Sequence, residues 1–192
     1  MVLAHYGVSV SRREIQQFLS SSPGKGLAYM AELAMFAVTR GIGSVCFGYN
    51  LALTDPNQDV GLSGYALSRQ LQAQRYSLKD DWARAMDDVL TNALEAGVGY
   101  RIARPNTNLL QSIIRQNIPL IATVTYVGLH NRRGDVYAGH TIVVNGWEGG
   151  KFWFIDPING RQCSIEPDDL LFAILSRKLI ADDAYMIGLQ PR

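Results

Sequence analysis

Cysteine is scarce in this 192-residue sequence, which contains only Cys46 and Cys163. Two cysteines cannot build the disulfide framework of a small secreted scaffold, because at most one bond can form between them. Disulfides are rare in reducing compartments, so we expect a reduced, cytoplasmic protein. Neither cysteine follows the signals of a helix N-terminus, which would lower the pKa of a thiol. Both are therefore interpreted as small buried hydrophobic residues rather than nucleophiles.

An excess of charge of one sign is also absent. The sequence has 18 Lys and Arg against 17 Asp and Glu, a formal net charge of +1 at pH 7. A nucleic-acid-binding protein usually presents a strongly basic face, and a polybasic membrane anchor needs clustered Lys and Arg. The longest apolar runs fall well short of the roughly 20 residues that a membrane span requires. We therefore expect neither a nucleic-acid partner nor a membrane span.

The common cofactor and metal motifs are missing as well. The sequence has no Gly-x-Gly-x-x-Gly after a strand, no P-loop, no Cys-x-x-Cys and no His-Glu-x-x-His. Pairs of adjacent aspartates are interpreted as helix starts and solvated helix faces. These pairs are Asp80-Asp81, Asp87-Asp88, Asp168-Asp169 and Asp182-Asp183. We therefore expect no cofactor and no metal ion.

The sequence does contain enough apolar material for a sizeable core. Hydrophobic residues make up 47% and charged residues 18% of the chain, which excludes a disordered tail. Helical spacing predicts helices near 12–19, within 27–40, within 50–98 and near 109–114. One short strand is predicted at 44–49, between the second and third of these segments. From Pro119 onward, β-branched and apolar runs predict strands at 120–126, 141–147, 151–156, 162–165 and 184–190, with a helix from Pro167. Helices followed by a strand meander indicate an α+β fold.

The first seven residues, from Met1 to Gly7, have no basic segment of the kind that opens a secretory signal. They are typical of the last turns of a helix that ends at a glycine cap. Ser11 and Glu14 have the spacing of a capping box for the helix that follows.

Three histidines are candidates for chemistry, and their settings differ. His140 enters a predicted buried strand, so its ring has a rigid mount and an open side, as a general base needs. His130 lies in a predicted polar loop and is interpreted as solvated. His5 lies in the opening helix and is interpreted as structural or exposed.

Asp156 ends the strand that returns from the predicted hairpin turn at 148–150. Counting back from that turn places Ile142 opposite Asp156, with His140 just beyond. A carboxylate beside an imidazole fixes its tautomer and stabilises the imidazolium. Asp156 is equally suited to capping the turn at 156–160, and spacing alone does not decide between the two roles.

Two blocks around these residues resemble a known pattern. They are Gly139-His140-Thr141-Ile142-Val143-Val144-Asn145-Gly146-Trp147 and Phe152-Trp153-Phe154-Ile155-Asp156-Pro157-Ile158-Asn159-Gly160. The pattern resembles the His and Asp half of family thirty-nine of the papain-clan cysteine peptidases, typified by the bacteriocin double-glycine leader peptidases. Segments 1–11, 30–34 and 119–122 resemble further parts of that domain, and 50–104 is an insert outside the pattern.

The resemblance implies a papain-like fold, with N-terminal helices packed on a C-terminal antiparallel sheet. It implies one domain over 1–192, with a helical half at 1–117 and a β-rich half at 118–192. Peptide-bond hydrolysis by a Cys-His-Asp triad would act on a peptide or protein substrate, with His140 as general base and Asp156 orienting it. The family's Cys-Gly nucleophile and oxyanion-hole Gln have no counterpart here. The sequence is therefore expected to be N-terminally truncated and inactive as given.

Two other functions stay open on the same fold. One is a catalytically inactive peptide-binding module. The other is acyltransferase or transglutaminase-like chemistry, which uses the same Cys-His-Asp logic.

Overall fold

The computed structural model describes residues 1–20, 29–62, 64–78, 80–130, 139–176 and 183–191. The chain forms two compact units. Unit 1 comprises Met1–Ala103 and Ile180–Arg192, and unit 2 comprises Arg104–Leu179. Each unit contains helices and strands, which confirms an α+β protein. Among the described residues, no helix combines the length and apolarity needed to cross a membrane.

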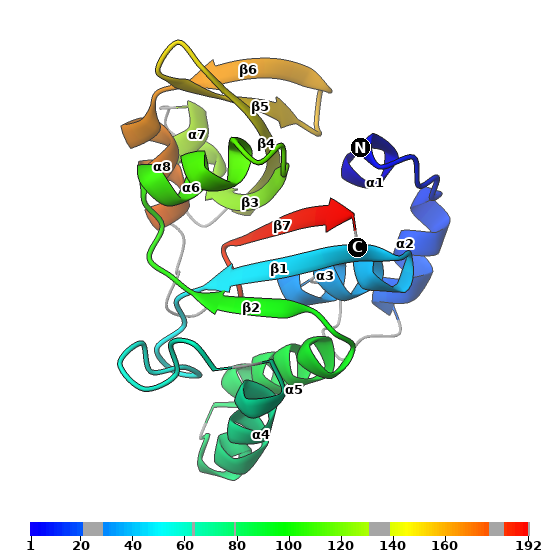
Figure 1. The fold of residues 1–192 in the computed structure, drawn as a ribbon, viewed down its shortest axis with the longest axis vertical. Coiled ribbons are helices and arrows are strands. Elements are labelled where there is room, and N and C mark those ends of the chain that lie inside the picture. Colours follow the sequence, from blue (N-terminus) through cyan, green and yellow to red (C-terminus); the bar gives the residue numbers. More distant parts are fainter. Residues whose placement is uncertain (21–28, 63, 79, 131–138, 177–182, 192) are drawn as a thin grey trace. The chain divides into compact units, whose positions relative to one another are not determined.

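Unit 1 is built around three strands with β1 (Ile42–Gly48) in the middle. Strand β2 (Gly99–Ile102) pairs with β1 in parallel, and β7 (Met186–Pro191) pairs with it antiparallel. Helix α3 (Met30–Thr39) packs on β1 and β7, and α5 (Asp81–Glu95) packs on α3 (Figure 1). Helix α4 (Gly64–Gln74) packs on α5 and continues into a 3-10 turn, η1 (Arg75–Ser77).

Strand β2 is not among the strands that the sequence predicts, since it begins directly after the segment at 50–98 whose spacing is helical. Its parallel pairing with β1 requires the whole α4–α5 segment as the connection. Gly48 of β1 makes room for it: a Cβ there would lie 1.8 Å from the Tyr100 hydroxyl. Because β1 and β2 precede the β-rich half, the strands do not simply follow the helices in the chain.

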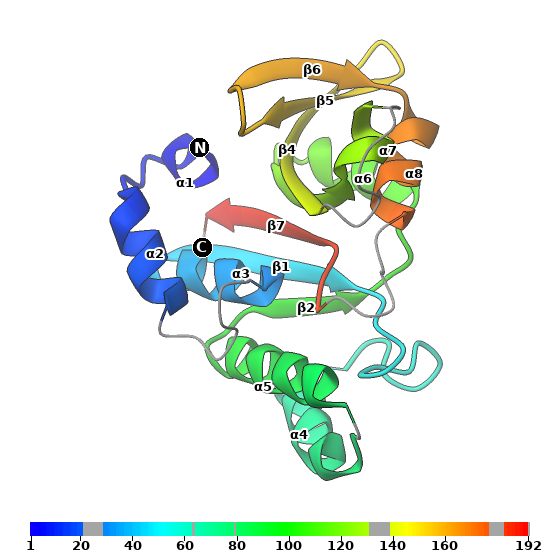
Figure 2. The ribbon, with the colours of Figure 1, turned by 180° about the vertical axis from the view of Figure 1, so that it is seen from behind.

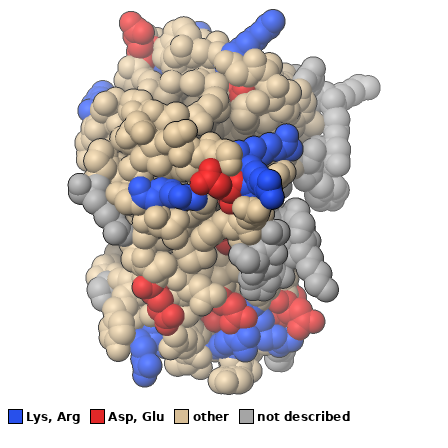
Figure 3. All heavy atoms as spheres, turned by 90° about the vertical axis from the view of Figure 1, so that its right-hand side faces the viewer, with Lys and Arg blue, Asp and Glu red and all other residues tan. Residues whose placement is uncertain are grey.

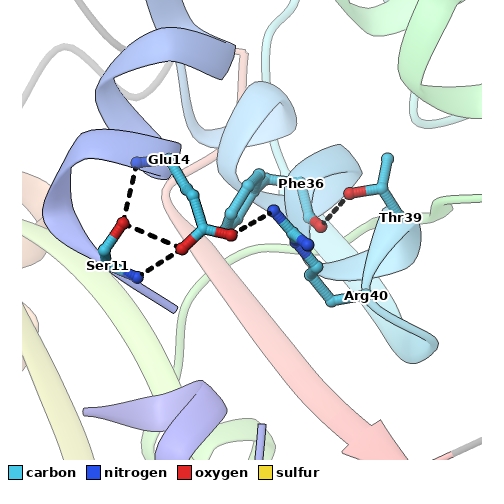
Figure 4. Close-up of polar contacts among 5 residues, drawn as sticks. All are labelled: Ser11, Glu14, Phe36, Thr39 and Arg40. Atoms are coloured by element: carbon cyan, nitrogen blue, oxygen red, sulfur yellow. Dashed lines mark hydrogen bonds and ion pairs between the residues drawn. The ribbon is translucent and has the colours of Figure 1, made fainter. Parts of the chain in front are cut away.

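The predicted caps near the N-terminus are confirmed. Helix α1 (Val2–His5) ends at Gly7, whose φ is +74° and whose N–H donates to the Ala4 carbonyl. Helix α2 (Arg12–Ser20) begins with the capping box, in which Ser11 N–H donates to Glu14 Oε2 at 2.7 Å and Glu14 N–H donates to Ser11 Oγ at 3.2 Å (Figure 4).

The same glutamate ties α2 to α3. Glu14 Oε1 accepts from Arg40 at 3.0 Å, and the Arg40 guanidinium lies 5.1 Å from the centre of the Phe36 ring (Figure 4). The Phe36 ring also meets Phe18 edge-on, with ring centroids 5.2 Å apart. An apolar ring contact therefore stabilises this helix pair more than the exposed ion pair does.

Unit 2 contains an antiparallel sheet in the order β3-β4-β5-β6. The strands are β3 (Leu120–Thr125), β4 (Gly139–Glu148), β5 (Lys151–Asp156) and β6 (Arg161–Ile165). The predicted β4–β5 hairpin is confirmed, and its turn residues Gly149 and Gly150 have φ of +60° and +79°. Positive φ at both positions is typical of the tight turn that matches strand twist.

Three helices cover the strands of unit 2. Helix α6 (Thr107–Ile114) packs on β4, and its N-cap is Asn106, whose Oδ1 accepts from Leu109 N–H at 2.9 Å. Helix α8 (Pro167–Leu175) packs on β3 and β5. Helix α7 (Tyr126–His130) packs on α8 (Figure 2) and directly follows β3.

The presence of α7 corrects two expectations, since Tyr126 was assigned to a strand and His130 to a polar loop. Gly128 explains the close packing: a Cβ there would lie 3.0 Å from the Ala173 Cα and 2.6 Å from Thr125 Oγ1. The absence of a side chain lets α7 contact α8 backbone to backbone, a tertiary effect that overrides local preference.

Two aspartates interpreted as parts of helix starts or solvated faces are instead buried. Asp183 is 4% exposed, and its Oδ2 accepts from Ala31 N–H at 2.6 Å at the start of α3. Asp87 is 1% exposed within α5. Asp80 fits the prediction, since it caps α5 by accepting from Trp82 N–H.

Replacement of Asp87 with Asn is expected to stabilise the protein at neutral pH. Burial raises the pKa of Asp87 to about 6, with Asp88 adding to the rise and Gln74 and Arg75 opposing it. The folded state therefore keeps the Asp87 proton up to a higher pH than the unfolded state does. The contribution of Asp87 to the free energy of unfolding falls as the pH rises from about 4 to about 6. We expect Asp87→Asn to raise the free energy of unfolding by about 1–2 kcal/mol at neutral pH.

Urea unfolding at neutral pH and near pH 4 checks this expectation, because the gain should vanish at the lower pH. Asp88→Asn is the matched control. Asp88 pairs with Arg75 at the surface, so its loss should cost at most about 1 kcal/mol at neutral pH. A variant Asp87→Asn that is destabilised equally at both pH values contradicts the prediction.

Candidate functional site in unit 2

One face of the unit 2 sheet is apolar except near one end. Ile142 and Val144 of β4 lie opposite Ala122 and Leu120 of β3, and all four are buried. Side chains alternate along a strand, so His140 shares this face two residues before Ile142. The fold therefore mounts His140 on a strand whose following inward residues are fixed in the core.

Asp156 meets His140 at this end of the face. His140 Nε2 lies 2.9 Å from Asp156 Oδ1, and the two side chains are 10% and 3% exposed. Val143 pairs with Ile155, so the next step of the register places Ile142 opposite Asp156, and this predicted pairing is reached through a bulge between Val144 and Gly146. The structure thus brings both sequence-predicted site residues together.

Asp156 also fills the second role that the sequence left open. Its Oδ1 accepts from Ile158 N–H at 2.9 Å, and its main-chain carbonyl accepts from Gly160 N–H at 2.8 Å. The turn at 156–160 therefore anchors the carboxylate that faces His140. One side chain serves both the turn and the imidazole.

This arrangement limits what His140 can do chemically. A carboxylate accepts a hydrogen bond, so Nε2 carries the proton between the two groups and Nδ1 is the nitrogen left to accept another. If Nδ1 takes a proton, Asp156 stabilises the resulting imidazolium. The pair therefore has the parts of a general base and its orienting group.

Two residues of α7, Tyr126 and His130, also lie beside the His140–Asp156 pair. The sequence did not predict either of them at the site. His130 Nε2 lies 3.7 Å from Asp156 Oδ2, and the His130 side chain is 30% exposed. The Tyr126 ring lies edge-on to both imidazoles, with centroids 4.5 Å from His130 and 5.5 Å from His140. The available signal was the i, i+4 spacing of the two aromatic rings, which places them on one side of a helix.

Neither cysteine is placed as a nucleophile for His140. Cys46 lies in unit 1 and is fully buried, and burial, with a smaller effect of Asp183, raises the pKa of its thiol well above the usual value. Cys163 lies in β6 opposite Phe154, two strands away from β4. Strand spacing and rise per residue put Cys163 roughly 16 Å from His140. The interpretation as a buried hydrophobic residue is confirmed for Cys46 and is wrong for Cys163, which is only partly buried.

The described residues hold no group of three or more His, Cys, Asp or Glu side chains arranged for a metal ion. On the face drawn in Figure 3, basic and acidic side chains are interspersed rather than gathered by sign. The expectations of no metal, no cofactor and no nucleic-acid partner stay predictions.

Comparison of the chain with protein-family models, with curated proteins and with solved structures gives no match.

Proposed function

We propose that unit 2 provides the general base and the orienting carboxylate of a cysteine-peptidase-like site on a papain-like fold. The observation that carries the proposal is the 2.9 Å contact between His140 Nε2 and Asp156 Oδ1 at the end of an apolar sheet face. A buried carboxylate is costly to maintain unless it accepts hydrogen bonds, and Asp156 has both His140 Nε2 and Ile158 N–H as partners. The G-H-x-x-V-V-x-G and D-P-x-x-G blocks carry both residues.

In the proposed reaction, His140 Nδ1 takes the proton of a cysteine thiol, and the thiolate attacks a peptide carbonyl carbon. The imidazolium then gives its proton to the leaving amine as the C–N bond breaks, and water hydrolyses the acyl-enzyme with His140 again as base. Asp156 keeps the imidazole in the required tautomer throughout. Because Cys46 is fully buried in unit 1 and Cys163 lies two strands away from β4, the proposal requires a thiol other than these two.

The test begins with the reading frame upstream of Met1, where an in-frame Gln followed by Cys-Gly is expected. A thiol-directed activity probe is then applied to the extended protein and to its His140→Ala variant. We expect labelling to fall by about 100-fold or more in the variant, because the thiolate loses its base. A Cys46→Ser, Cys163→Ser double variant should label like the parent protein.

Two outcomes overturn the proposal. One is an upstream sequence without a cysteine, and the other is equal labelling of the parent protein and the His140→Ala variant. Where labelling behaves as expected, product analysis with a peptide containing a Gly-Gly pair separates hydrolysis from acyl transfer.

The misplaced cysteines favour a second candidate, a catalytically inactive peptide-binding module on the same fold. It predicts calorimetric binding of the same Gly-Gly peptide by the 192-residue chain, with affinity within a few-fold in His140→Ala. Complete loss of binding in that variant counts against the module, because the imidazole would then be part of the chemistry rather than of the surface.

A further inference from the structure

The Asp156 carboxylate faces two imidazoles rather than one. Its Oδ1 contacts His140 Nε2 at 2.9 Å, and its Oδ2 lies 3.7 Å from His130 Nε2. The first distance is a hydrogen bond. The second is too long for one but within the range of an ion pair, so it becomes attractive when His130 is protonated. Nothing in the Cys-His-Asp scheme uses this second histidine.

The local fold holds His130 in this position. Helix α7 begins directly after β3, at the strand end where Val124 lies opposite His140. Tyr126 and His130 stand one helical turn apart, and the Tyr126 ring contacts both imidazoles at its edge. The shared tyrosine and the shared carboxylate join the two histidines into one cluster.

We propose that His130 is a positioning residue that shares Asp156 with His140, so that protonation of either imidazole opposes protonation of the other. This inference rests on the proposed function, because it concerns the protonation of His140, the general base of that site. Asp156 has one negative charge, and two imidazolium rings around it would leave the cluster positively charged in a mostly buried setting. Two groups coupled in this way titrate as a unit.

Several other charged or titratable groups belong to the elements packed around the cluster, and Arg161 of β6 lies opposite Asp156 in the sheet register. Tyr126 is on α7 itself, and Asp156 and His140 come from β5 and β4. Helix α8, which packs on α7, has Asp168 and Asp169 in its first turn. Their effect is separated by an Asp168→Asn, Asp169→Asn control.

The experiment follows the ring signals of the histidines by NMR in the isotope-labelled 192-residue protein, from about pH 5 to about pH 8. In His130→Gln, the titration midpoint of His140 is expected to move to higher pH by about 0.5–1 unit, because a competing charge is removed. In His140→Gln, the midpoint of His130 should move by the same amount, since coupling is reciprocal.

Reciprocal shifts support the proposal, and a purely structural role for His130 would not produce equal shifts in both directions. An unmoved His140 midpoint in folded His130→Gln and His130→Ala overturns it, as does an equal shift in the α8 control. The readout does not depend on a nucleophile. Coupling without thiol reactivity in the extended protein would contradict the proposed function alone, and reactivity without coupling would contradict this inference alone.

Discussion

Replacing Asp156 with Ala is expected to lower the free energy of unfolding by about 2–6 kcal/mol, because it removes the shared acceptor of two hydrogen bonds in a buried setting. The carboxylate is 3% exposed and accepts from both His140 Nε2 and Ile158 N–H. Its removal leaves a nearly buried imidazole and a backbone N–H of the 156–160 turn without that acceptor. Each orphaned polar group costs about 1–3 kcal/mol.

Urea unfolding monitored by circular dichroism measures the loss. Asp156→Asn keeps the shape and an acceptor oxygen, so it should cost only about 1–2 kcal/mol. Asp169→Ala is the matched control, because Asp169 is exposed in the first turn of α8 and should change stability by at most about 0.5 kcal/mol. If Asp156→Ala costs no more than Asp169→Ala, the contacts of Asp156 do not stabilise the fold.

The His140–Asp156 contact was predictable as to its hairpin, because both residues lie on strands joined by a short turn. The prediction counted from a turn at 148–150, whereas the hairpin has a two-residue turn at 149–150 and a bulge at Asn145. The bulge shifts the register by one residue, and the two differences cancel, so Ile142 still lies opposite Asp156. The distance between the two side chains then follows from strand spacing.

His130 was not predictable in the same way. Its segment contains a valine and a glycine that suit a strand or loop as well as a helix. The helix forms because Gly128 allows close packing against Ala173, a residue far along the chain. Once α7 exists, His130 reaches Asp156. A histidine in a polar stretch therefore became a neighbour of the site through one tertiary contact, and its i, i+4 spacing to Tyr126 is informative only once the helix is known.

The buried aspartates were missed for a related reason. A carboxylate beside another carboxylate in the sequence is typical of a solvated surface, and that holds for Asp80 at its helix cap. Asp183 instead accepts a hydrogen bond from Ala31 N–H at the N-terminus of α3, 152 residues earlier in the chain. Helix N-termini leave amide groups unsatisfied, and nothing in the sequence of the helix says which distant acceptor will fill that need.

Replacing Phe152 with Ala is expected to lower the free energy of unfolding by about 3–5 kcal/mol, because it opens a cavity in the core of unit 2. Phe152 is fully buried in β5, opposite Trp147 and Ile165 on the two neighbouring strands. Its ring meets the Trp147 ring edge-on, with centroids 4.6 Å apart. The loss therefore includes the area of a buried ring and one aromatic contact.

The same chain offers a matched control in Phe172, which is 65% exposed on α8. Phe172→Ala should change stability by at most about 0.5 kcal/mol in the same urea titration. Equal losses in the two variants would mean that the β4–β5–β6 sheet does not form the core of unit 2. Because Asp156 ends the strand that contains Phe152, a loosened hairpin should also weaken the His140 contact, seen as a change in the His140 ring signals.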